Sequence, residues 1–361
     1  MDRYGEIMER EKQYKDVTIK DVARRAGVAI STVSRVLNGL DKVSEKTEKK
    51  VRRAVEELGY VQNALAVSMV TGQTKTILMV VPDFTNDFNG SVIQGAEEYL
   101  KAHGYTMLIF STKDFKERDF ENLYRRFSKL ADGILVVPGN PDQMDYTRWE
   151  KPFVLVDSYR PQGDYYTIEI DNERGTFLLT EELIKNGHRR IGLIGGIPDE
   201  SASGRRVAGY LAAMKQYRIP VDQRLMAPGY HFEDTGSRGM SAFLSLPEPV
   251  RPTAAVAVNN LTCIGCMKAL AERGMRAGRE ISLAAFDDHL LARYSVPGVT
   301  VIERPTIEMG KEGARVLLQI LEGEAPKEKR LIMESRLVRR DSVKHLPVSG
   351  DGESKPESPG K

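Results

Sequence analysis

The sequence has little of what defines several classes of protein. It contains two cysteines and one tryptophan in 361 residues, which excludes a disulfide-framed secreted scaffold and a cysteine-rich zinc array. No stretch approaches the ~18 consecutive apolar residues that a membrane span requires. Residues 1–16 are polar and have no apolar segment typical of a signal peptide. We therefore expect a soluble cytoplasmic protein. Since about 100–200 residues form one domain, its length predicts two or three domains.

The charge of the chain is unevenly distributed. The whole chain has 53 Lys+Arg against 51 Asp+Glu, a net charge of +2. Residues 17–75 carry 11 basic and 6 acidic side chains, a net charge of +5, and the remainder carries 42 basic and 45 acidic ones, a net charge of −3. A basic segment suits nucleic acid, but an ordinary solvated surface remains an alternative at this point.

Residues 17–58 have the apolar spacing of three short helices. Thr18 and Asp21 form a capping signal before the first helix, Gly27 ends it, and Ser44 begins the third. Two short helices joined at a glycine, with the second presenting polar side chains outward, are typical of a helix–turn–helix unit. The pattern predicts a small all-α domain.

The hydrophobic pattern of the sequence changes at Thr76, after which short apolar segments alternate with amphipathic segments. Such alternation predicts parallel sheets connected by right-handed crossovers. The predicted strands are residues 77–81, 105–110, 133–137, 153–157, 166–170, 190–196, 255–260, 281–288 and 299–303. The predicted helices are residues 89–103, 117–130, 174–186, 204–217, 261–273 and 306–321. Two such series predict two doubly wound lobes, with a ligand site in the cleft between them.

Several motifs carry a family resemblance over about residues 17–342. They are TIKDVA at 18–23, AGV at 26–28, TVSRVLN at 32–38, PDFTNDF at 82–88, DNERG at 171–175, GHRRIG at 187–192 and FDD at 286–288. With these motifs the chain resembles the lactose-repressor/galactose-repressor family of bacterial transcriptional regulators. The resemblance implies a helix–turn–helix head, a periplasmic-binding-protein-like α/β core and a homodimer on palindromic operator DNA. It also implies a dimer face near residues 89–103 and 261–273.

The resemblance and the composition together divide the chain into segments. They are a disordered leader at 1–16, the head at 17–62, a hinge helix and linker at 63–75, a first lobe at 76–171 and 301–325, a second lobe at 172–300 and 326–342, and a disordered tail at 343–361. We expect the protein to act in the cytoplasm, at the nucleoid.

The resemblance also implies which residues contact DNA. The side chains expected to face base edges are those of Ala29, Ile30, Ser31 and Arg35. The residues expected to contact the DNA backbone, or to support the residues that do, are Thr18, Thr32, Ser34, Asn38, Ser44, Thr47, Tyr60, Asn63 and Ala66. Met69 stands where the family has an apolar wedge for the minor groove. Gln62 replaces the usual proline, which leaves the chain direction into the hinge less fixed, and a plain linker is the alternative for this segment.

Six residues are candidates for the ligand cleft. They are Phe88, Asp157, Arg206, His231, Asn259 and Asp287. Charged and amide side chains at strand ends suit the hydroxyls of a sugar-like polyol better than a purine. The alternatives are surface or helix-capping roles for the polar residues, a core position for Phe88 and an exposed loop for His231. Asp288 is expected to cap a helix.

No pattern of residues predicts catalysis, a metal site or a cofactor. Cys263 and Cys266 form a C-x-x-C pair at a helix start, but they lack the surroundings of a redox or zinc site and are expected in the core. Three further alternatives concern the core domain: control by a phosphorylated carrier protein, transport as a solute-binding protein, and a sugar-modifying enzyme. The head argues against the second, and the missing nucleophile and base argue against the third.

Overall fold

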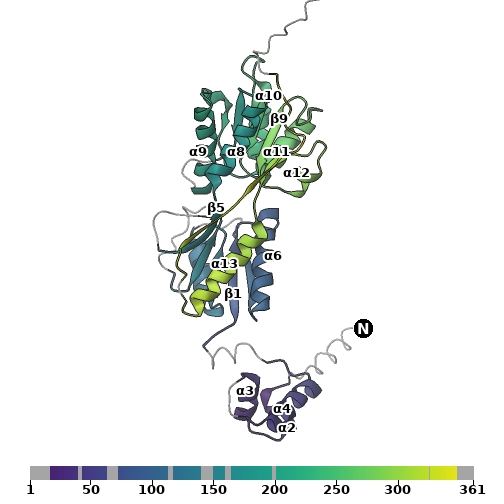
Figure 1. Cartoon of the computed structure of the whole chain (residues 1–361). Helices are drawn as coiled ribbons and strands as arrows, with labels where there is room; N and C mark the ends of the chain where they lie inside the picture. Colours follow the sequence, from purple (N-terminus) through teal and green to yellow (C-terminus); the bar gives the residue numbers. More distant parts are fainter. Residues whose placement is uncertain are drawn as a thin grey trace, which may run out of the picture. The chain divides into compact units, whose positions relative to one another are not determined.

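The computed structural model describes residues 17–39, 43–62, 72–112, 117–139, 149–158, 164–196, 201–324 and 326–347. By internal contacts the chain divides into two compact units, Met1–Lys75 and Thr76–Lys361 (Figure 1). The predicted leader and the hinge candidates Asn63, Ala66 and Met69 lie outside the described residues. No helix in the described ranges has the length and apolar composition needed to cross a membrane.

The head consists of three helices, α2 (Ile19–Ala26), α3 (Ile30–Leu37) and α4 (Glu45–Leu58). Helix α2 begins where the Asp21 carboxylate accepts hydrogen bonds from the backbone N–H and the hydroxyl of Thr18, at 3.1 and 2.7 Å. It ends at Gly27, whose φ of +67° permits the sharp turn into α3. The buried core of the head is Val22, Ala23, Val33, Val36, Val51 and Ala54.

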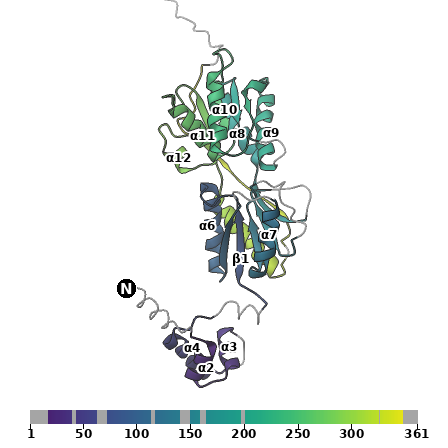
Figure 2. The same cartoon turned by 180° about the vertical axis from the view of Figure 1, so that it is seen from behind.

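The first lobe is built on a sheet in the order β11-β5-β4-β3-β1-β2. Its strands are β1 (Thr76–Val81), β2 (Thr106–Ser111), β3 (Gly133–Val136), β4 (Phe153–Val156), β5 (Tyr166–Ile170) and β11 (Arg330–Met333), all paired in parallel. Its helices are α6 (Asp87–Ala102), α7 (Glu117–Phe127), the short η1 (Ser128–Leu130) and α13 (Thr306–Leu321). Figure 2 shows α6 and α7 beside β1, and Figure 1 shows α13 next to α6 although it comes late in the chain.

The second lobe repeats this architecture with the sheet order β12-β10-β9-β8-β6-β7. Its strands are β6 (Ile191–Ile194), β7 (Met226–Ala227), β8 (Ala254–Ala257), β9 (Ser282–Phe286), β10 (Thr300–Glu303) and β12 (Arg336–Val338), of which only β12 is antiparallel to its neighbour. Its helices are α8 (Asn172–Lys185), α9 (Ser201–Gln216), η4 (Gln223–Leu225), α10 (Glu233–Ser245), α11 (Asn260–Ala271) and α12 (Leu290–Tyr294). The predicted fold class, a helical head and two parallel-sheet lobes, is confirmed.

The lobe boundaries differ from the predicted ones in two places. Residues 301–303 were expected in the first lobe, but β10 pairs with β9 in the second. Residues 326–342 were expected in the second lobe, but β11 pairs with β5 as an edge strand of the first. Because β11 is only partly buried, its apolar pattern carries no signal about which sheet it joins. The chain therefore passes between the lobes after β5, after β10 and after β11.

The predicted disordered tail is wrong for its first residues. Residues 343–347 are ordered against the second lobe, where the backbone N–H of Leu346 donates to the Asn186 carbonyl at 2.8 Å. His188 also contributes to this attachment, since its Nε2 lies 3.0 Å from the Lys344 carbonyl oxygen and its Nδ1 lies 2.9 Å from the Thr253 hydroxyl.

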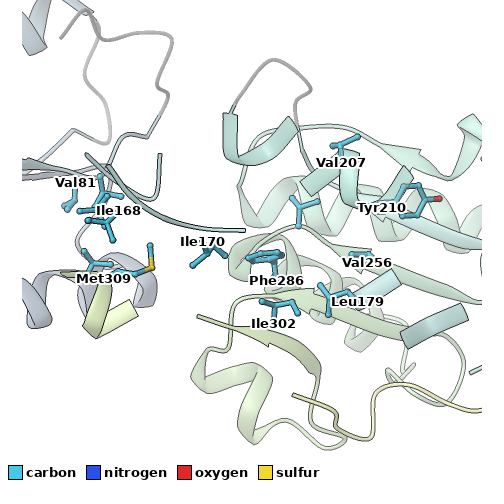
Figure 3. Close-up of a cluster of buried hydrophobic side chains, with 14 of the residues drawn as sticks. Val81, Ile168, Ile170, Leu179, Val207, Tyr210, Val256, Phe286, Ile302 and Met309 are labelled. Carbon is cyan, nitrogen blue, oxygen red and sulfur yellow. The ribbon is translucent and has the colours of Figure 1, made fainter. Parts of the chain in front are cut away.

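The buried core continues from one lobe into the other. Val81, Ile168 and Met309 belong to the first lobe, and Phe286 and Ile302 to the second, yet they form one cluster of buried side chains. Figure 3 shows Ile170, at the end of β5, between the two groups. The crossovers are therefore packed in apolar surroundings on both sides.

Helices α6 and α13 cross so closely that each needs a glycine at the contact. A Cβ on Gly310 would lie 2.1 Å from the Val92 carbonyl oxygen, and a Cβ on Gly95 would lie 1.9 Å from that of Ile307. We expect Gly310→Ala to lower the free energy of unfolding by about 1–3 kcal/mol, because the helices must separate. Urea unfolding measures it, with Gly90→Ala as control, since a Cβ there meets only one atom at 3.9 Å. Equal stability of the two variants would contradict the packing.

The burial of His188 predicts a pH dependence of stability. Desolvation lowers the pKa of His188 to about 4 from 6.5, so the unfolded chain binds its proton more readily than the folded one. Its contribution should be complete above about pH 6.5 and decline toward pH 4 by up to about 1.4 kcal/mol per pH unit. Urea unfolding at pH 7, 5.5 and 4.5 should show a shallower decline for His188→Gln than for the wild type. The exposed His103→Gln should keep the wild-type slope.

Candidate DNA-binding face and ligand cleft

Helix α3 of the head has two unlike faces. Val33 and Val36 are buried in the head core, whereas Ile30, 45% exposed, and the exposed Ser31 and Arg35 face away from it. Ala29 precedes the helix as its N-cap residue and is also exposed. The structure thus brings all four residues expected at base edges onto the outer surface of one helix and its N-terminus, as a recognition helix requires.

Arg35 differs from the other arginines of the head. The others pair with carboxylates of the head, Arg24 with Asp21, Arg25 and Arg53 with Glu57, and Arg52 with Glu48. Arg35 has no carboxylate partner among the described residues. An exposed guanidinium without such a partner keeps its N–H groups free for a bidentate bond to guanine.

The residues expected at the DNA backbone form local hydrogen bonds at helix ends. The Ser44 hydroxyl accepts from the backbone N–H of Thr47 and caps α4. The Ser34 hydroxyl accepts from the side-chain amide of Asn38 at 3.2 Å. Tyr60 packs against the head core, and Thr32 is partly exposed on α3. Their contacts with phosphates stay a prediction.

Gln62 is held in place by a hydrogen bond to α3. Its side-chain amide donates to the Oδ1 of Asn38 at 2.9 Å, across 24 positions of the sequence. The expectation that the lost proline leaves the chain direction into the hinge less fixed concerns residues outside the described ranges and stays a prediction. The bond ties the last described residue before the hinge segment to the C-terminal end of the recognition helix.

We expect Gln62→Ala to weaken specific DNA binding by about 2- to 10-fold, the range that corresponds to loss of one hydrogen bond. The bond joins the residue before the hinge segment to the recognition helix, so we expect non-specific binding to change less than specific binding. Fluorescence anisotropy with operator and with unrelated DNA measures both. Val61→Ala is the matched control because Val61 is 84% exposed. Identical behaviour of the two variants would show that the bond has no role on DNA.

In the core domain, two aspartates occupy equivalent positions in the two lobes. Asp157 follows β4 and Asp287 follows β9, and both have a left-handed φ, +63° and +75°. Each donates its backbone N–H to the adjacent strand, Asp157 to Ile168 at 2.7 Å and Asp287 to Ile302 at 3.0 Å. A non-glycine residue in this region is uncommon and marks sites where a side chain must point in a set direction.

A single arginine joins these two carboxylates. Arg304 lies in the crossover after β10, with Nη1 2.7 Å from Asp157 Oδ2 and Nη2 2.5 Å from Asp287 Oδ1. Its side chain is 2% exposed, and its Cζ lies 3.8 Å from the centre of the Phe88 ring. Burial opposes its charge, but the two carboxylates outweigh burial and raise the pKa of Arg304. Sequence reasoning missed this residue.

Arg206 is buried beside this group, on the second lobe. Its Nε donates to Asn172 Oδ1 at 2.8 Å, and its Nη1 donates to the Val258 carbonyl at 2.7 Å. Its Cζ lies 4.0 Å from the centre of the Phe286 ring, which lies 5.7 Å from Arg304 as well. The Phe286 ring therefore lies against both cations, an arrangement that favours fixed guanidinium orientations.

His231 and Phe88 also belong to this group. The Nε2 of His231 is buried and has no hydrogen-bond partner among the described residues, so the alternative of an exposed loop residue is not what the structure has. Burial, with Arg206 and Arg304 nearby, lowers the pKa of His231 to about 3, and the ring is neutral near pH 7. Phe88 is partly buried and packs both on the interlobe core and under Arg304.

Two further residues near the cleft were candidates for helix caps, and only Asn259 is one. Asn259 caps α11, where its Oδ1 accepts from the backbone N–H and the hydroxyl of Thr262 at 3.0 and 2.7 Å. Asp288 does not cap α12. It pairs with Arg340 and Arg293, and the N-cap of α12 is His289, whose Nδ1 accepts from the Ala292 N–H.

Two further contacts join the lobes around this group. Asn260 on α11 donates its side-chain amide to Asn86, the N-cap residue of α6, at 2.9 Å. Glu169 on β5 pairs with Arg205 of the second lobe and with Arg330 of its own. Burial, reinforced by Asp157, raises the pKa of Glu169 although both arginines oppose it.

A cavity of about 870 Å³ lies between the lobes on one side of Arg304. Phe88, Asp287 and Arg304 line it, together with parts of α6, α12 and the crossovers, but Asp157, Arg206 and His231 do not. The predicted ligand residues thus form two sets on either side of Arg304, one that lines the cavity and one that does not. The volume is that of a site for a small molecule.

The structure shows no other constellation of chemical groups in the ranges that it describes. Cys263 and Cys266 are free and fully buried, as expected, and burial raises the pKa of both thiols, that of Cys263 to about 12. Within the described ranges, no three His, Cys, Asp or Glu side chains are grouped to hold a metal ion. The functional features are the recognition helix and the interlobe group.

The protein combines a helix–turn–helix head with a two-lobed core that has charged groups at the carboxyl ends of its strands. This combination defines the class of transcription regulators with a sensor domain. Residues 18–63 match the model of "Bacterial regulatory proteins, lacI family", and residues 180–343 match "Periplasmic binding protein-like domain". The chain is 34% identical over 334 residues to the HTH-type transcriptional repressor PurR of Vibrio atlanticus (strain LGP32), covering 91% of this chain and 99% of that one. The chain belongs to the lacI family.

Solved structures share the fold. The lac repressor dimer bound to operator and the anti-inducer ONPF superposes with a TM-score of 0.80 at 24% identity, covering 91% of this chain and all of that one. The complex of the transcriptional regulator CelR with cellobiose superposes with a TM-score of 0.68 at 29% identity, covering 90% and 99%. The fold is therefore shared with solved transcription regulators.

Proposed function

We propose that the protein is a dimeric repressor that binds a palindromic operator in the cytoplasm and whose DNA affinity is set by a small, sugar-like effector in the interlobe cleft. The observation that carries the proposal is the pair of carboxylates, Asp157 and Asp287, that face one another from equivalent strand ends of the two lobes. A relative that is 34% identical is named a transcriptional repressor.

The polar groups of the cleft support a hydroxyl-rich effector. Oδ1 of Asp157 and Nε2 of His231 are buried without a hydrogen-bond partner among the described residues, and so is Nε of Arg304. A polyol offers a donor to the carboxylate and acceptors to the N–H groups through the same hydroxyls. The partly buried ring of Phe88 adds the apolar surface on which sugar C–H groups pack. Cellobiose, the molecule bound to the related CelR, is of this class.

Linkage explains how such an effector controls DNA binding. A ligand shifts the head only if it binds one arrangement of the lobes better than another. Its contacts to Asp157 and Asp287 lie on different lobes, so its affinity depends on how the lobes are placed. The first lobe begins at β1, immediately after the linker to the head, and the chain thereby connects lobe movement to the two hinge segments of a dimer.

A thermal-shift screen of the full chain against neutral sugars, sugar acids, nucleosides and nucleobases tests the proposal. A compound at about 100 times its Kd adds about 2.7 kcal/mol of stability. We expect the shift from one or a few neutral sugars, and the same compound should change operator affinity in fluorescence anisotropy. Stabilisation by nucleobases alone would refute the sugar-like class, and a binder without any effect on DNA affinity would refute the regulatory mechanism.

A further inference from the structure

The crossover after β10 places a buried arginine where it contacts both lobes at once. Arg304 pairs with Asp157 of the first lobe and with Asp287 of the second, and its side chain is 2% exposed. The predicted cleft residues Asp157 and Arg206 lie outside the cavity that Arg304 lines. Arg304 thus fills the space between the two carboxylates that an effector in the cleft would bind.

We propose that Arg304 is a latch and a specificity-determining residue of the cleft: it joins Asp157 to Asp287 when no effector is bound, and an effector has to compete with its guanidinium for these carboxylates. The inference rests on the proposed function only where it concerns the effector. The cross-lobe contact itself is independent of DNA.

The charges in the cleft make this contact strong. One guanidinium pairs with both carboxylates at once, and removing one partner of this buried ion group leaves the remaining charge uncompensated. The Phe88 ring covers one face of the guanidinium, with Cζ 3.8 Å from its centre. The two ion pairs and the stacking on the ring hold the guanidinium, and a lysine at this position could not reproduce the stacking of a planar cation.

The same geometry restricts the chemistry of the effector. A molecule that takes over Asp157 and Asp287 must supply hydrogen-bond donors to both, and it must offer acceptors to Arg304, which stays nearby on the short crossover. Adjacent hydroxyls of a neutral polyol do both. A purely anionic molecule without hydroxyls offers no donor and is repelled by both carboxylates. Arg304 therefore narrows the ligand class to neutral, polyhydroxylated molecules.

The test measures the distance between the lobes in the full chain without DNA or effector. Spin labels at Lys101→Cys on α6 and Arg238→Cys on α10 use exposed positions, with side chains 79% and 77% exposed, while the native cysteines are buried. Labelled protein mixed with excess unlabelled protein gives one labelled protomer per assembly. Double electron–electron resonance then gives the distribution of interlobe distances.

We expect Arg304→Gln and Asp157→Asn each to add a second, separate distance population containing at least half of the molecules, and the double variant to match the single ones. Arg224→Gln, which loses an exposed arginine paired within one lobe, should keep the wild-type distribution. Methylguanidinium chloride should restore the wild-type distance in Arg304→Ala, whereas sodium chloride at equal ionic strength should not.

Wild-type distances in Arg304→Gln would overturn the proposal, and so would equal restoration by both salts. If Arg304→Gln does not fold, Asp157→Asn decides by the same criterion, because it leaves Arg304 paired with Asp287 alone. A protein that shows the expected distances but binds no palindromic DNA would refute the proposed function and leave the latch standing.

Discussion

Replacement of Arg35 by alanine is expected to weaken binding to the specific operator by about 10- to 100-fold, the range of one good bidentate contact to a base. Arg35 is exposed on α3 and has no carboxylate partner among the described residues. No ion pair with a carboxylate of the described residues has to be broken before its guanidinium binds a guanine. Binding to unrelated DNA, which depends on total charge, should fall only a few-fold.

Arg24→Ala is the matched control for Arg35→Ala. It removes one exposed arginine from the same small domain, but Arg24 is paired with Asp21 at 3.1 Å on α2. Both variants lose one positive charge, so the slope of log affinity against log salt should change about equally. Anisotropy titrations with operator and with scrambled DNA separate the two effects. Equal loss of specific affinity in both variants would mean that Arg35 does not read bases.

Replacement of Arg206 by alanine is expected to weaken effector binding by at least about 100-fold, and with it the response of DNA affinity. Arg206 makes two charge-assisted hydrogen bonds, to Asn172 and Val258, and such bonds contribute about 1.5–3 kcal/mol each. Its loss also leaves Phe286 without the cation stacked on it. Both acceptors are buried and would be left without this donor, which disrupts the arrangement that an effector needs.

The Arg224→Ala variant is the control for Arg206→Ala. Arg224 is exposed and pairs with Asp222 within the second lobe. Effector affinity is measured by calorimetry with the sugar that gives the largest thermal shift, and DNA affinity by anisotropy with and without it. Arg206→Ala should bind operator like the wild type but no longer respond. An unchanged response would exclude Arg206 from the site.

The sequence predicts much of the cleft because a simple geometric rule applies to it. Polar residues directly after buried parallel strands meet at one edge of the sheet, and this rule identifies Asp157 and Asp287. Arg304 follows β10 in the same manner, but the glutamate before it and the proline after it make it look like part of an ordinary polar turn. The rule cannot predict that one arginine pairs with a carboxylate from each lobe, because this pairing depends on how the two lobes are placed in space.

Helix caps and short elements were harder to predict. Asn259, Asp288 and His289 are all polar residues before a helix, and only the backbone geometry decides which of them caps. Helix α10 was missed because two glycines, Gly236 and Gly239, interrupt its pattern; both are required by close contacts with Thr262 and Ile194. Tertiary packing, not helix propensity, selects these residues.

In the head, local sequence was sufficient. The apolar spacing, the cap at Thr18 and the turn at Gly27 predicted the boundaries of α2 and α3 because each depends on residues within one or two helical turns. The bond between Gln62 and Asn38 spans 24 positions and had no local signal. Sequence reasoning therefore located the recognition surface but not the contact between its helix and Gln62.

We propose that the head reads a two-fold symmetric DNA site under the control of a ligand in the core. Selection of DNA from a random library by the full-length protein, with and without the sugar found in the thermal-shift screen, tests this proposal. We expect enrichment of one palindrome with half-sites about one helical turn apart, and a large change in its recovery when the sugar is present. Recovery of DNA without any palindrome, or recovery of the same palindrome to the same extent with and without the sugar, would contradict it.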